Sequence, residues 1–289
     1  MTADNPARGA LLVTAAALMF ASMGVLIRFA TQQLPNEQVV FLRNFFGLLI
    51  LLPLLLRNGI GASLRTDRLA LHVVRSLCGL AAMYCFFYAL ANLALADAVL
   101  LNFTAPLFIP FIALLWLRET VSRQVIAAIV IGFAGILLVL KPGLGVFNPA
   151  ALVGLASGVF AAIAMVSLRT LSATDPPLRV VIYYGIICTS VSAVPMLWAW
   201  QPAPLETFLQ LAGAGAFATA GQYLLSRGYG YAPAAQIGPF TYTSVVFAAT
   251  YGWLFWKEMP DWLSASGTVL IVIAGALAMQ KTRAASSIA

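Results

Sequence analysis

Long apolar stretches, each ended by a short polar turn, recur along the whole chain. A bilayer core about 30 Å thick needs roughly 20 apolar residues per helical span, so stretches of this length predict transmembrane helices. The pattern predicts ten spans, at about residues 9–30, 38–56, 70–91, 96–117, 123–140, 150–171, 178–199, 206–228, 233–256 and 262–280. The breaks between them carry Pro, Gly and Asn, which favour turns. We therefore predict an all-α integral membrane protein.

Composition supports a lipid environment. Of the 289 residues, 62% are hydrophobic and 9% are charged, whereas a soluble domain carries about 25% charged residues. The three cysteines lie in apolar stretches without paired spacing, which argues against a disulfide framework or a metal cluster. We expect neither a metal nor a cofactor. We interpret the net charge of +7 as loop charge that orients the chain in a bilayer, not as a nucleic-acid surface.

Lysine and arginine concentrate on one side of the predicted topology. Three lie at span ends on the side opposite the N-terminus: Arg28, Lys141 and Lys257. Eleven lie at ends on the same side as the N-terminus, namely Arg8, Arg57, Arg65, Arg68, Arg118, Arg123, Arg169, Arg179, Arg227, Lys281 and Arg283. Because cytoplasmic loops are rich in Lys and Arg, we expect both termini in the cytoplasm, in a multi-pass protein of a bacterial inner membrane.

The two halves of the chain resemble each other. Ala89–Lys141 aligns without a gap with Gly228–Gln280, 139 residues later. Within this alignment LLWLRE (Leu114–Glu119) matches WLFWKE (Trp253–Glu258). Five spans per half is an odd number, so the second half enters the membrane from the opposite side.

The repeat predicts the fold class and suggests a mechanism. We predict ten transmembrane helices arranged as two inverted-topology five-helix repeats, residues 1–141 and 150–281, with a short cytoplasmic tail at 282–289. Inverted repeats of this kind are an architecture of transporters that work by alternating access.

Particular motifs resemble a known family. FYALANLALADAVLLNFTAPLFIPFIALLWLRE (Phe87–Glu119), with GFAG at 132–135, resembles the EamA domain of the drug/metabolite transporter superfamily. FLRNFFGLL (Phe41–Leu49) resembles that domain's second helix, and the second copy ends with WKE (256–258) and SGTVLIVIAG (266–275). The resemblance covers nearly the whole chain as two copies.

That resemblance implies ten helices, cytoplasmic termini and a central cavity formed mainly by helices one to four and six to nine. It places helices five and ten at the periphery, where such proteins often form a homodimer contact. Members of the family export amino acids, dipeptides, opine-type metallophores and drugs, and others import nucleotide-like or sugar metabolites.

Two arginines, Arg43 and Arg75, lie inside predicted spans. Charge within a membrane is costly and usually functional, and a guanidinium suits a substrate carboxylate. The alternative is that each snorkels to the headgroups. His72 lies one turn before Arg75, and His72 and Asp97 are candidates for proton coupling. Arg28, at the end of the first span, is interpreted as an interfacial anchor.

Tyrosines, amides and prolines form a second group of candidates. A buried tyrosine hydroxyl needs a partner, which is either a substrate or a neighbouring helix. Besides the two arginines, we expect substrate contacts from Tyr84, Asn102, Tyr184, Gln222, Tyr223 and Tyr242. A proline removes a backbone hydrogen bond, so spans four and nine either bend to gate a path or carry ordinary kinks. The prolines concerned are Pro106, Pro110 and Pro239.

Together these residues favour a secondary transporter that exports a small amphoteric metabolite, an amino acid or an amino-acid-derived compound such as an opine-type metallophore. The alternatives are an importer of a nucleotide-like metabolite and an exporter of cationic drugs, which would normally need a buried acid. All nine acidic residues fall at span ends or in loops, and there is one histidine, so we do not expect an enzyme. The expected partners are a small-molecule substrate, the lipid bilayer and a second copy of the chain, with no nucleic acid.

Overall fold

The structure, a computed structural model, describes residues 6–58, 65–105, 107–109, 111–112, 123–140, 148–171, 174–229, 231, 238–259 and 261–280. Its regular elements within these ranges are all helical. They are α1 (Pro6–Thr31), α2 (Asn36–Asn58), α4 (Leu69–Asn92), α5 (Leu95–Asn102), α7 (Arg123–Leu140), α8 (Ala150–Leu171), α9 (Pro177–Ala199), α10 (Leu205–Tyr229), the 3-10 helix η1 (Gly238–Tyr242), α12 (Thr243–Trp256) and α13 (Trp262–Gln280).

The helices follow the apolar stretches of the sequence closely. α8 has the bounds expected for the sixth span, and α9 begins with Pro177 in its first turn, where proline's missing N–H is not needed. Among the described residues, four helices are long and apolar enough to cross a membrane, namely Ala7–Thr31, Leu69–Asn92, Ala150–Leu168 and Leu178–Ala199. The architecture agrees with the prediction of a helical membrane protein.

Two of the expected spans are interrupted. α5 ends at Asn102, and the hydroxyl of Thr104 then donates to the carbonyl oxygen of Leu101 at 2.6 Å, which satisfies a carbonyl at the helix end. The described part of the expected ninth span begins with η1, which contains Pro239, and continues as α12. Pro106 and Pro110 lie outside the described residues.

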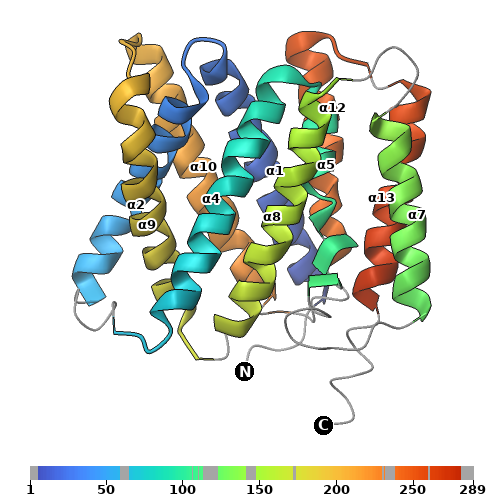
Figure 1. Ribbon diagram of the computed structural model, residues 1–289, viewed down its shortest axis with the longest axis horizontal. Helices are drawn as coiled ribbons and strands as arrows, with labels where there is room; N and C mark the ends of the chain where they lie inside the picture. Colours follow the sequence, from blue (N-terminus) through green and yellow to red (C-terminus); the bar gives the residue numbers. More distant parts are fainter. Residues whose placement is uncertain are drawn as a thin grey trace.

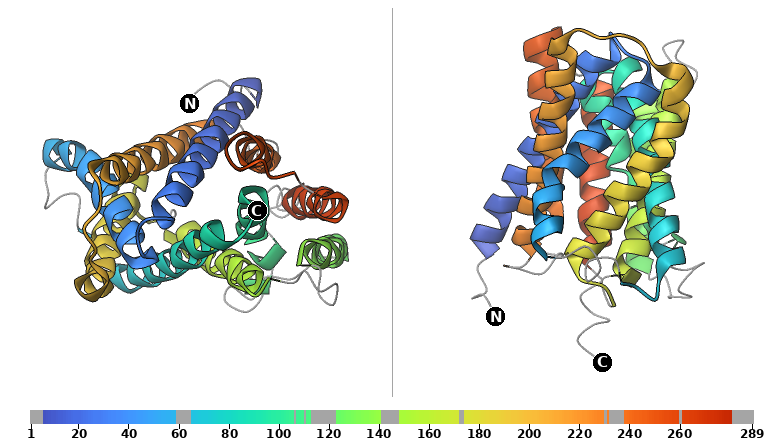
Figure 2. Two further views of the ribbon diagram at one scale, coloured as in Figure 1. Left: turned by 90° about the horizontal axis from the view of Figure 1, so that it is seen from above. Right: turned by 90° about the vertical axis from the view of Figure 1, so that its left-hand side faces the viewer.

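The helices run along a common direction and form defined pairs (Figure 1). α1 packs along α10, α4 packs along α8, and α2 contacts both α9 and α10. α7 and α13 pack against each other at one edge of the bundle, as Figure 2 shows from above. A Cβ added to Gly135 of α7 would lie 2.8 Å from the carbonyl oxygen of Gly267 of α13. Such close backbone contact through small residues is common between membrane helices.

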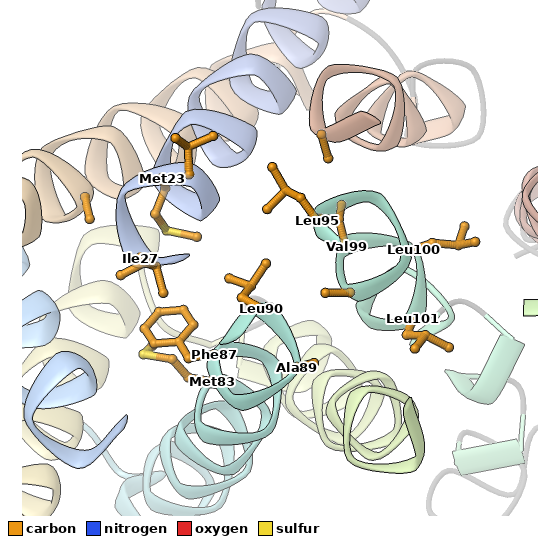
Figure 3. Packing of buried hydrophobic residues seen from close by; sticks show 14 of the residues in the cluster. Met23, Ile27, Met83, Phe87, Ala89, Leu90, Leu95, Val99, Leu100 and Leu101 are labelled. Carbon is orange, nitrogen blue, oxygen red and sulfur yellow. The ribbon is translucent and has the colours of Figure 1, made fainter. Parts of the chain in front are cut away.

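Part of the apolar core lies where α1, α4 and α5 meet (Figure 3). Ile27 of α1 and Phe87 and Leu90 of α4 lie next to Leu95 and Val99 of α5, and all five are buried. A contiguous set of apolar contacts of this kind fixes how helices sit relative to one another. It therefore positions three helices that also carry charged residues.

Large apolar side chains are also exposed on the outside of the bundle. Leu197 is 82% exposed, Val246 64% and Trp262 75%. Soluble monomers rarely expose apolar patches of more than a few hundred Å². Lipid removes the free-energy cost of such a surface, since the cost arises from contact with water.

Candidate substrate site

Arg75 of α4 and Tyr184 of α9 stack where these two helices meet. The Arg75 Cζ lies 4.0 Å from the centroid of the Tyr184 ring. A cation–π contact uses the face of the guanidinium and leaves the N–H donors at its edge available. The Nε and Nη1 atoms of Arg75 are buried and have no hydrogen-bond partner among the described residues. Because unpaired buried donors cost free energy, Arg75 can bind an acceptor that the described chain does not supply.

Arg43 adds a second positive charge from α2. Its Nη1 donates to Asn44 Oδ1 at 2.9 Å, while its Nε is buried and lacks a partner within the described ranges. The charges of Arg43 and Arg75 both lie within electrostatic range of the Tyr184 hydroxyl and the Cys188 thiol. Neither arginine forms an ion pair with a carboxylate in the part of the chain that the structure describes.

We refer to Arg43, Arg75, Tyr184 and Cys188 as the arginine cluster. Its four side chains come from α2, α4 and α9, so residues from both halves of the chain contribute. Two cations within electrostatic range of the same hydroxyl and thiol, with no carboxylate partner among the described residues, are suited to an anionic ligand. Three of the predicted site residues, Arg43, Arg75 and Tyr184, are brought together here.

Tyr84 lies on α4, and its backbone oxygen accepts a hydrogen bond from Asn36 Nδ2 at 2.9 Å. Its hydroxyl is buried and has no partner among the described residues. The Cys188 thiol lies within electrostatic range of this hydroxyl. Tyr84 therefore offers a further polar group near the arginine cluster.

Asn102 and Tyr242 lie away from this cluster and contact other helices. Asn102 donates from Nδ2 to Ser157 Oγ at 3.1 Å, which joins α5 to α8. Tyr242 is buried in η1 and donates to the carbonyl oxygen of Phe103 at 3.4 Å. In this conformation both residues connect helices.

Gln222 and Tyr223 are exposed on α10. The Tyr223 side chain is 61% exposed, and the Cζ of Arg227 lies 5.8 Å from its ring centroid. The structure does not bring these two residues to the arginine cluster.

His72 is fully buried near the start of α4 and belongs to a polar network. Its Nε2 lies 3.6 Å from Asp175 Oδ2, which is an ion-pair distance, and its ring stacks on Tyr183 with centroids 4.4 Å apart. Asp175 also accepts hydrogen bonds from Arg179 Nη1 at 2.8 Å and from Thr66 Oγ1 at 3.2 Å. The network ties the start of α4 to the segment between α8 and α9.

Asp175 stays ionised in this network. Burial by itself would raise the pKa of its carboxyl group, but the hydrogen bonds from Arg179 and Thr66, together with the electrostatic effect of His72, hold that pKa below its ordinary value of 3.8.

Arg28 and Glu258 form a bidentate ion pair at the opposite end of the bundle, where α1 ends (Figure 1). Arg28 donates from Nη1 to Oε2 at 2.9 Å and from Nη2 to Oε1 at 2.5 Å. The backbone N–H of Leu95 also donates to Oε2 at 2.9 Å, and the Arg28 Cζ lies 4.4 Å from the Trp256 ring centroid. The pair connects α1, the end of α12 and the start of α5, a connection that the sequence pattern did not predict.

A cavity of about 270 Å³ lies beside this ion pair. Its lining includes Asp97, Gly252, Glu258 and Asp261. The two candidates for proton coupling are therefore separated, with Asp97 at this end and His72 at the other.

Asn44 contacts the arginine cluster and Cys188 is part of it, but neither residue was predicted from the sequence. Asn44 is adjacent to Arg43, and Cys188 follows Tyr184 by one helical turn. Helical periodicity would have placed Cys188 on the face of Tyr184, but a cysteine in an apolar stretch gave no other signal. No group of three His, Cys, Asp or Glu side chains in the described ranges could hold a metal ion.

Comparison with known proteins relates the whole chain to transporters. Residues 7–141 and 148–280 each match the model of the EamA-like transporter family. The pseudopaline exporter CntI of Pseudomonas aeruginosa is 35% identical over 286 residues, which cover 98% of this chain and 99% of that protein. A riboflavin transporter of Vibrio cholerae is 30% identical, covering 93% of this chain and 92% of its own length.

A more distant relative is an S-adenosylmethionine uptake transporter of Rickettsia prowazekii, 27% identical over 86% of this chain and 84% of its own. A solved crystal structure with 19% sequence identity superposes with a TM-score of 0.65, covering 97% of this chain and 99% of that chain. At that identity the likeness concerns the fold alone.

Proposed function

Because the chain belongs to the EamA-like transporter family of the drug/metabolite transporter superfamily, we propose that it is a secondary transporter that exports a small amphoteric metabolite by alternating access. The cargo carries carboxylate groups and is an amino acid or an amino-acid-derived compound such as an opine-type metallophore. The observation that carries this proposal is the arginine cluster, where Arg43 and Arg75 have buried donors and no carboxylate partner among the described residues.

The chemistry of the cluster supports a carboxylate ligand. Charge-assisted hydrogen bonds from a guanidinium to a carboxylate are about twice as strong as neutral ones and fix the orientation of the ligand. Carboxylate groups of the substrate would satisfy Nε and Nη1 of Arg75, which belong to different edges of the guanidinium, and Nε of Arg43; these three donors are buried and have no partner among the described residues. The apolar and aromatic surroundings, among them Tyr84 and Tyr184, tolerate the organic part of such a molecule.

The helix pairs support an inverted repeat as the basis of alternating access. In chain order, α1 and α10 would be spans one and eight, and α4 and α8 would be spans three and six. If the two halves of the chain are exchanged, the α1–α10 pair takes the place of the α4–α8 pair. The pairs α2–α9 and α7–α13 each join equivalent spans of the two halves, so the exchange leaves them unchanged. We accordingly propose ten spans in two five-helix repeats, residues 1–141 and 150–281, with a tail at 282–289.

The distribution of Lys and Arg supports an orientation in a bacterial inner membrane with both termini in the cytoplasm. α1 begins and α13 ends at the same end of the bundle (Figure 1). In this orientation the His72–Asp175 network lies on the cytoplasmic side and the Arg28–Glu258 ion pair on the outer side.

The relatives support export and also one alternative. At 35% identity over nearly the full length, a relative named as a pseudopaline exporter favours export and makes pseudopaline the first compound to test. The relative named as an S-adenosylmethionine uptake transporter favours, more weakly, import of a nucleotide-like metabolite. Export of cationic drugs has less support, because no carboxylate pairs with the arginine cluster in the described part of the chain.

The test is transport of labelled pseudopaline into proteoliposomes that contain the purified protein, with unlabelled riboflavin and S-adenosylmethionine as competitors. We expect transport by the wild-type protein and a strong reduction of transport in Arg43→Ala and Arg75→Ala, larger in Arg75→Ala. Direction is read from cells that make pseudopaline and have this protein as their exporter, which should secrete the compound.

Arg227→Ala is a matched control, because Arg227 also lies over a tyrosine ring but on the exposed surface of α10. This variant should transport normally. Unchanged transport in both cluster variants would contradict a carboxylate site at the arginine cluster. Uptake of labelled S-adenosylmethionine, without transport of pseudopaline, would favour the alternative function, import of a nucleotide-like metabolite.

A further inference from the structure

Gly79 provides the space in which the Tyr184 ring lies. A Cβ added to Gly79 would lie 2.8 Å from Cε2 and 3.4 Å from the hydroxyl oxygen of Tyr184. Interiors are close-packed, and contacts below 3 Å force a side chain to move. Even alanine at this position would therefore push the ring away from α4. Gly79 lies one turn after Arg75, so both residues are on the same face of the helix.

The position of this ring fixes the position of Arg75. An arginine side chain has several rotatable bonds, and ordering it costs up to about 2 kcal/mol of conformational free energy. The Tyr184 ring, 4.0 Å from the guanidinium carbon, holds the group by its face before any ligand arrives. The Nε and Nη1 donors at its edge remain without a partner among the described residues.

A separate contact fixes α9 against the same turn of α4. The thiol of Cys188, one turn after Tyr184, donates to the carbonyl oxygen of Ser76 at 3.5 Å. Cys188 and Ser76 are both fully buried. The two helices are thus held together at the residue next to Arg75, and a displaced Tyr184 ring could not regain its place by a shift of the whole helix.

We propose that Gly79 and Tyr184 are positioning residues for carboxylate recognition. Tyr184 holds the Arg75 guanidinium so that its edge donors receive the substrate carboxylate, and Gly79 supplies the space for the ring. The proposal rests on the proposed function and adds to it a source of selectivity. A guanidinium held by its face recognises a planar carboxylate at its edge and discriminates against the corresponding amide, which offers one acceptor atom in place of two.

The test is a double-mutant cycle between Gly79→Ala and Tyr184→Leu, measured as KM and Vmax for labelled pseudopaline in proteoliposomes. Gly79→Ala should displace the Tyr184 ring, so that Arg75 loses a desolvated cation–π contact and is no longer held in place before the substrate binds. We therefore expect KM to rise about tenfold, with Vmax changed less. In the Tyr184→Leu background Gly79→Ala should have no further effect, because no ring remains to be displaced. Tyr184→Phe keeps the ring, so its KM should lie closer to wild type than that of Tyr184→Leu.

Gly47→Ala is the matched control. Gly47 is also a helical glycine, on α2, but a Cβ added there would meet no atom within 4 Å. This variant should have the wild-type KM. A second control is inhibition of transport by the amide analogue of the substrate. Relative to the carboxylate, the amide should compete better only in variants in which the Tyr184 ring no longer lies against Arg75.

The outcomes separate this proposal from the proposed function. If Arg75→Ala leaves transport unchanged, the carboxylate site itself is wrong. If Arg75→Ala abolishes transport while the effects of Gly79→Ala and Tyr184→Leu simply add, the positioning role is overturned and the site stands. If the wild-type protein does not move pseudopaline, the same cycle is measured on the melting temperature of the purified protein, and additive effects there also overturn the proposed contact.

Discussion

Arg28 and Arg75 have similar aromatic surroundings but different electrostatic ones. Each guanidinium carbon lies over a ring, at 4.4 Å from the Trp256 centroid and at 4.0 Å from that of Tyr184. Arg28 also holds the carboxylate of Glu258 in a bidentate pair, whereas Arg75 has no such partner among the described residues. The first site shows how an arginine over an aromatic ring holds a carboxylate in this protein, and the second has an arginine over a ring without a carboxylate among the described residues.

Local backbone structure explains why Glu258 reaches Arg28. α12 ends at Trp256, and the next residue, Lys257, has a left-handed φ of 58°. This reversal of the backbone lets the N–H of Glu258 donate to the carbonyl oxygen of Gly252 at 3.1 Å. Gly252 also leaves room for the carboxylate, since a Cβ there would lie 2.9 Å from Glu258 Oε2. The ion pair is thus built into a helix terminus.

The largest effect that would distinguish the two sites is on transport by Arg75→Ala. Removal of the donors for a desolvated carboxylate should reduce Vmax/KM at least about 30-fold. The melting temperature should change little, because no ion pair of the described chain is lost. Proteoliposome transport and thermal unfolding of the same preparation measure both quantities. A large fall in melting temperature would mean that Arg75, like Arg28, has a structural role.

At the Arg28 site, Glu258→Gln should lower the stability of the protein, whereas Arg75→Ala should reduce transport. The side chains of Arg28 and Glu258 are 12% and 24% exposed, so loss of the charge should lower the free energy of unfolding by about 1.5–3 kcal/mol. Arg28→Ala in this background should add little, because the two residues act as a pair. Independent, additive losses in melting temperature would show that the pair does not couple the helices.

Arg43→Ala should reduce transport less than Arg75→Ala, by about tenfold. The reason is that Arg43 already donates to Asn44 and has fewer unpaired N–H groups. Asn44→Ala provides the sharper comparison, since it frees Nη1 of Arg43 and should tighten binding of the carboxylate. A KM that rises in Asn44→Ala would show instead that Asn44 orients Arg43.

The smallest effect concerns the third charged site, around Asp175, and depends on pH. Hydrogen bonds hold the pKa of Asp175 below 3.8 in the folded protein, so its stabilising contribution is fully present above that value. The contribution is lost as pH falls through the lower, folded-state pKa. The melting temperature of the wild-type protein should fall in this acidic range, and that of Asp175→Asn should fall less steeply. If the melting temperatures of the two proteins fell in parallel with pH, Asp175 would not be the cause of the acid sensitivity.

The helices could be predicted from apolar runs because a long apolar run by itself favours a helix of matching length. Expected span 70–91 became α4, Leu69–Asn92, and expected span 123–140 became α7 with the same bounds. The break in the fourth span after Asn102, beyond which residues 105, 107–109 and 111–112 are again helical, could not be placed to the residue. It depends on Thr104 satisfying the carbonyl of Leu101, a local competition that hydropathy does not record.

The candidate site could be predicted only in part. Intramembrane charge pointed to Arg43 and Arg75, and a mid-span hydroxyl pointed to Tyr184. The stacking of Arg75 on Tyr184 and the pairing of Arg28 with Glu258 join residues from opposite halves of the chain. Such contacts arise from tertiary packing, to which one sequence gives no direct access. The exposure of Tyr223 has the same cause, since a tyrosine within an apolar stretch does not determine which way its helix, α10, faces.

The contact between α7 and α13 has a consequence for how the chain is made. Gly135 packs against Gly267, which the ribosome adds 132 residues later. At about 5–20 residues per second, α7 waits roughly 7–26 s for its principal partner. Until then α13 cannot cover the surface of α7 that carries Gly135. This edge of the bundle is complete only after α13 has been made.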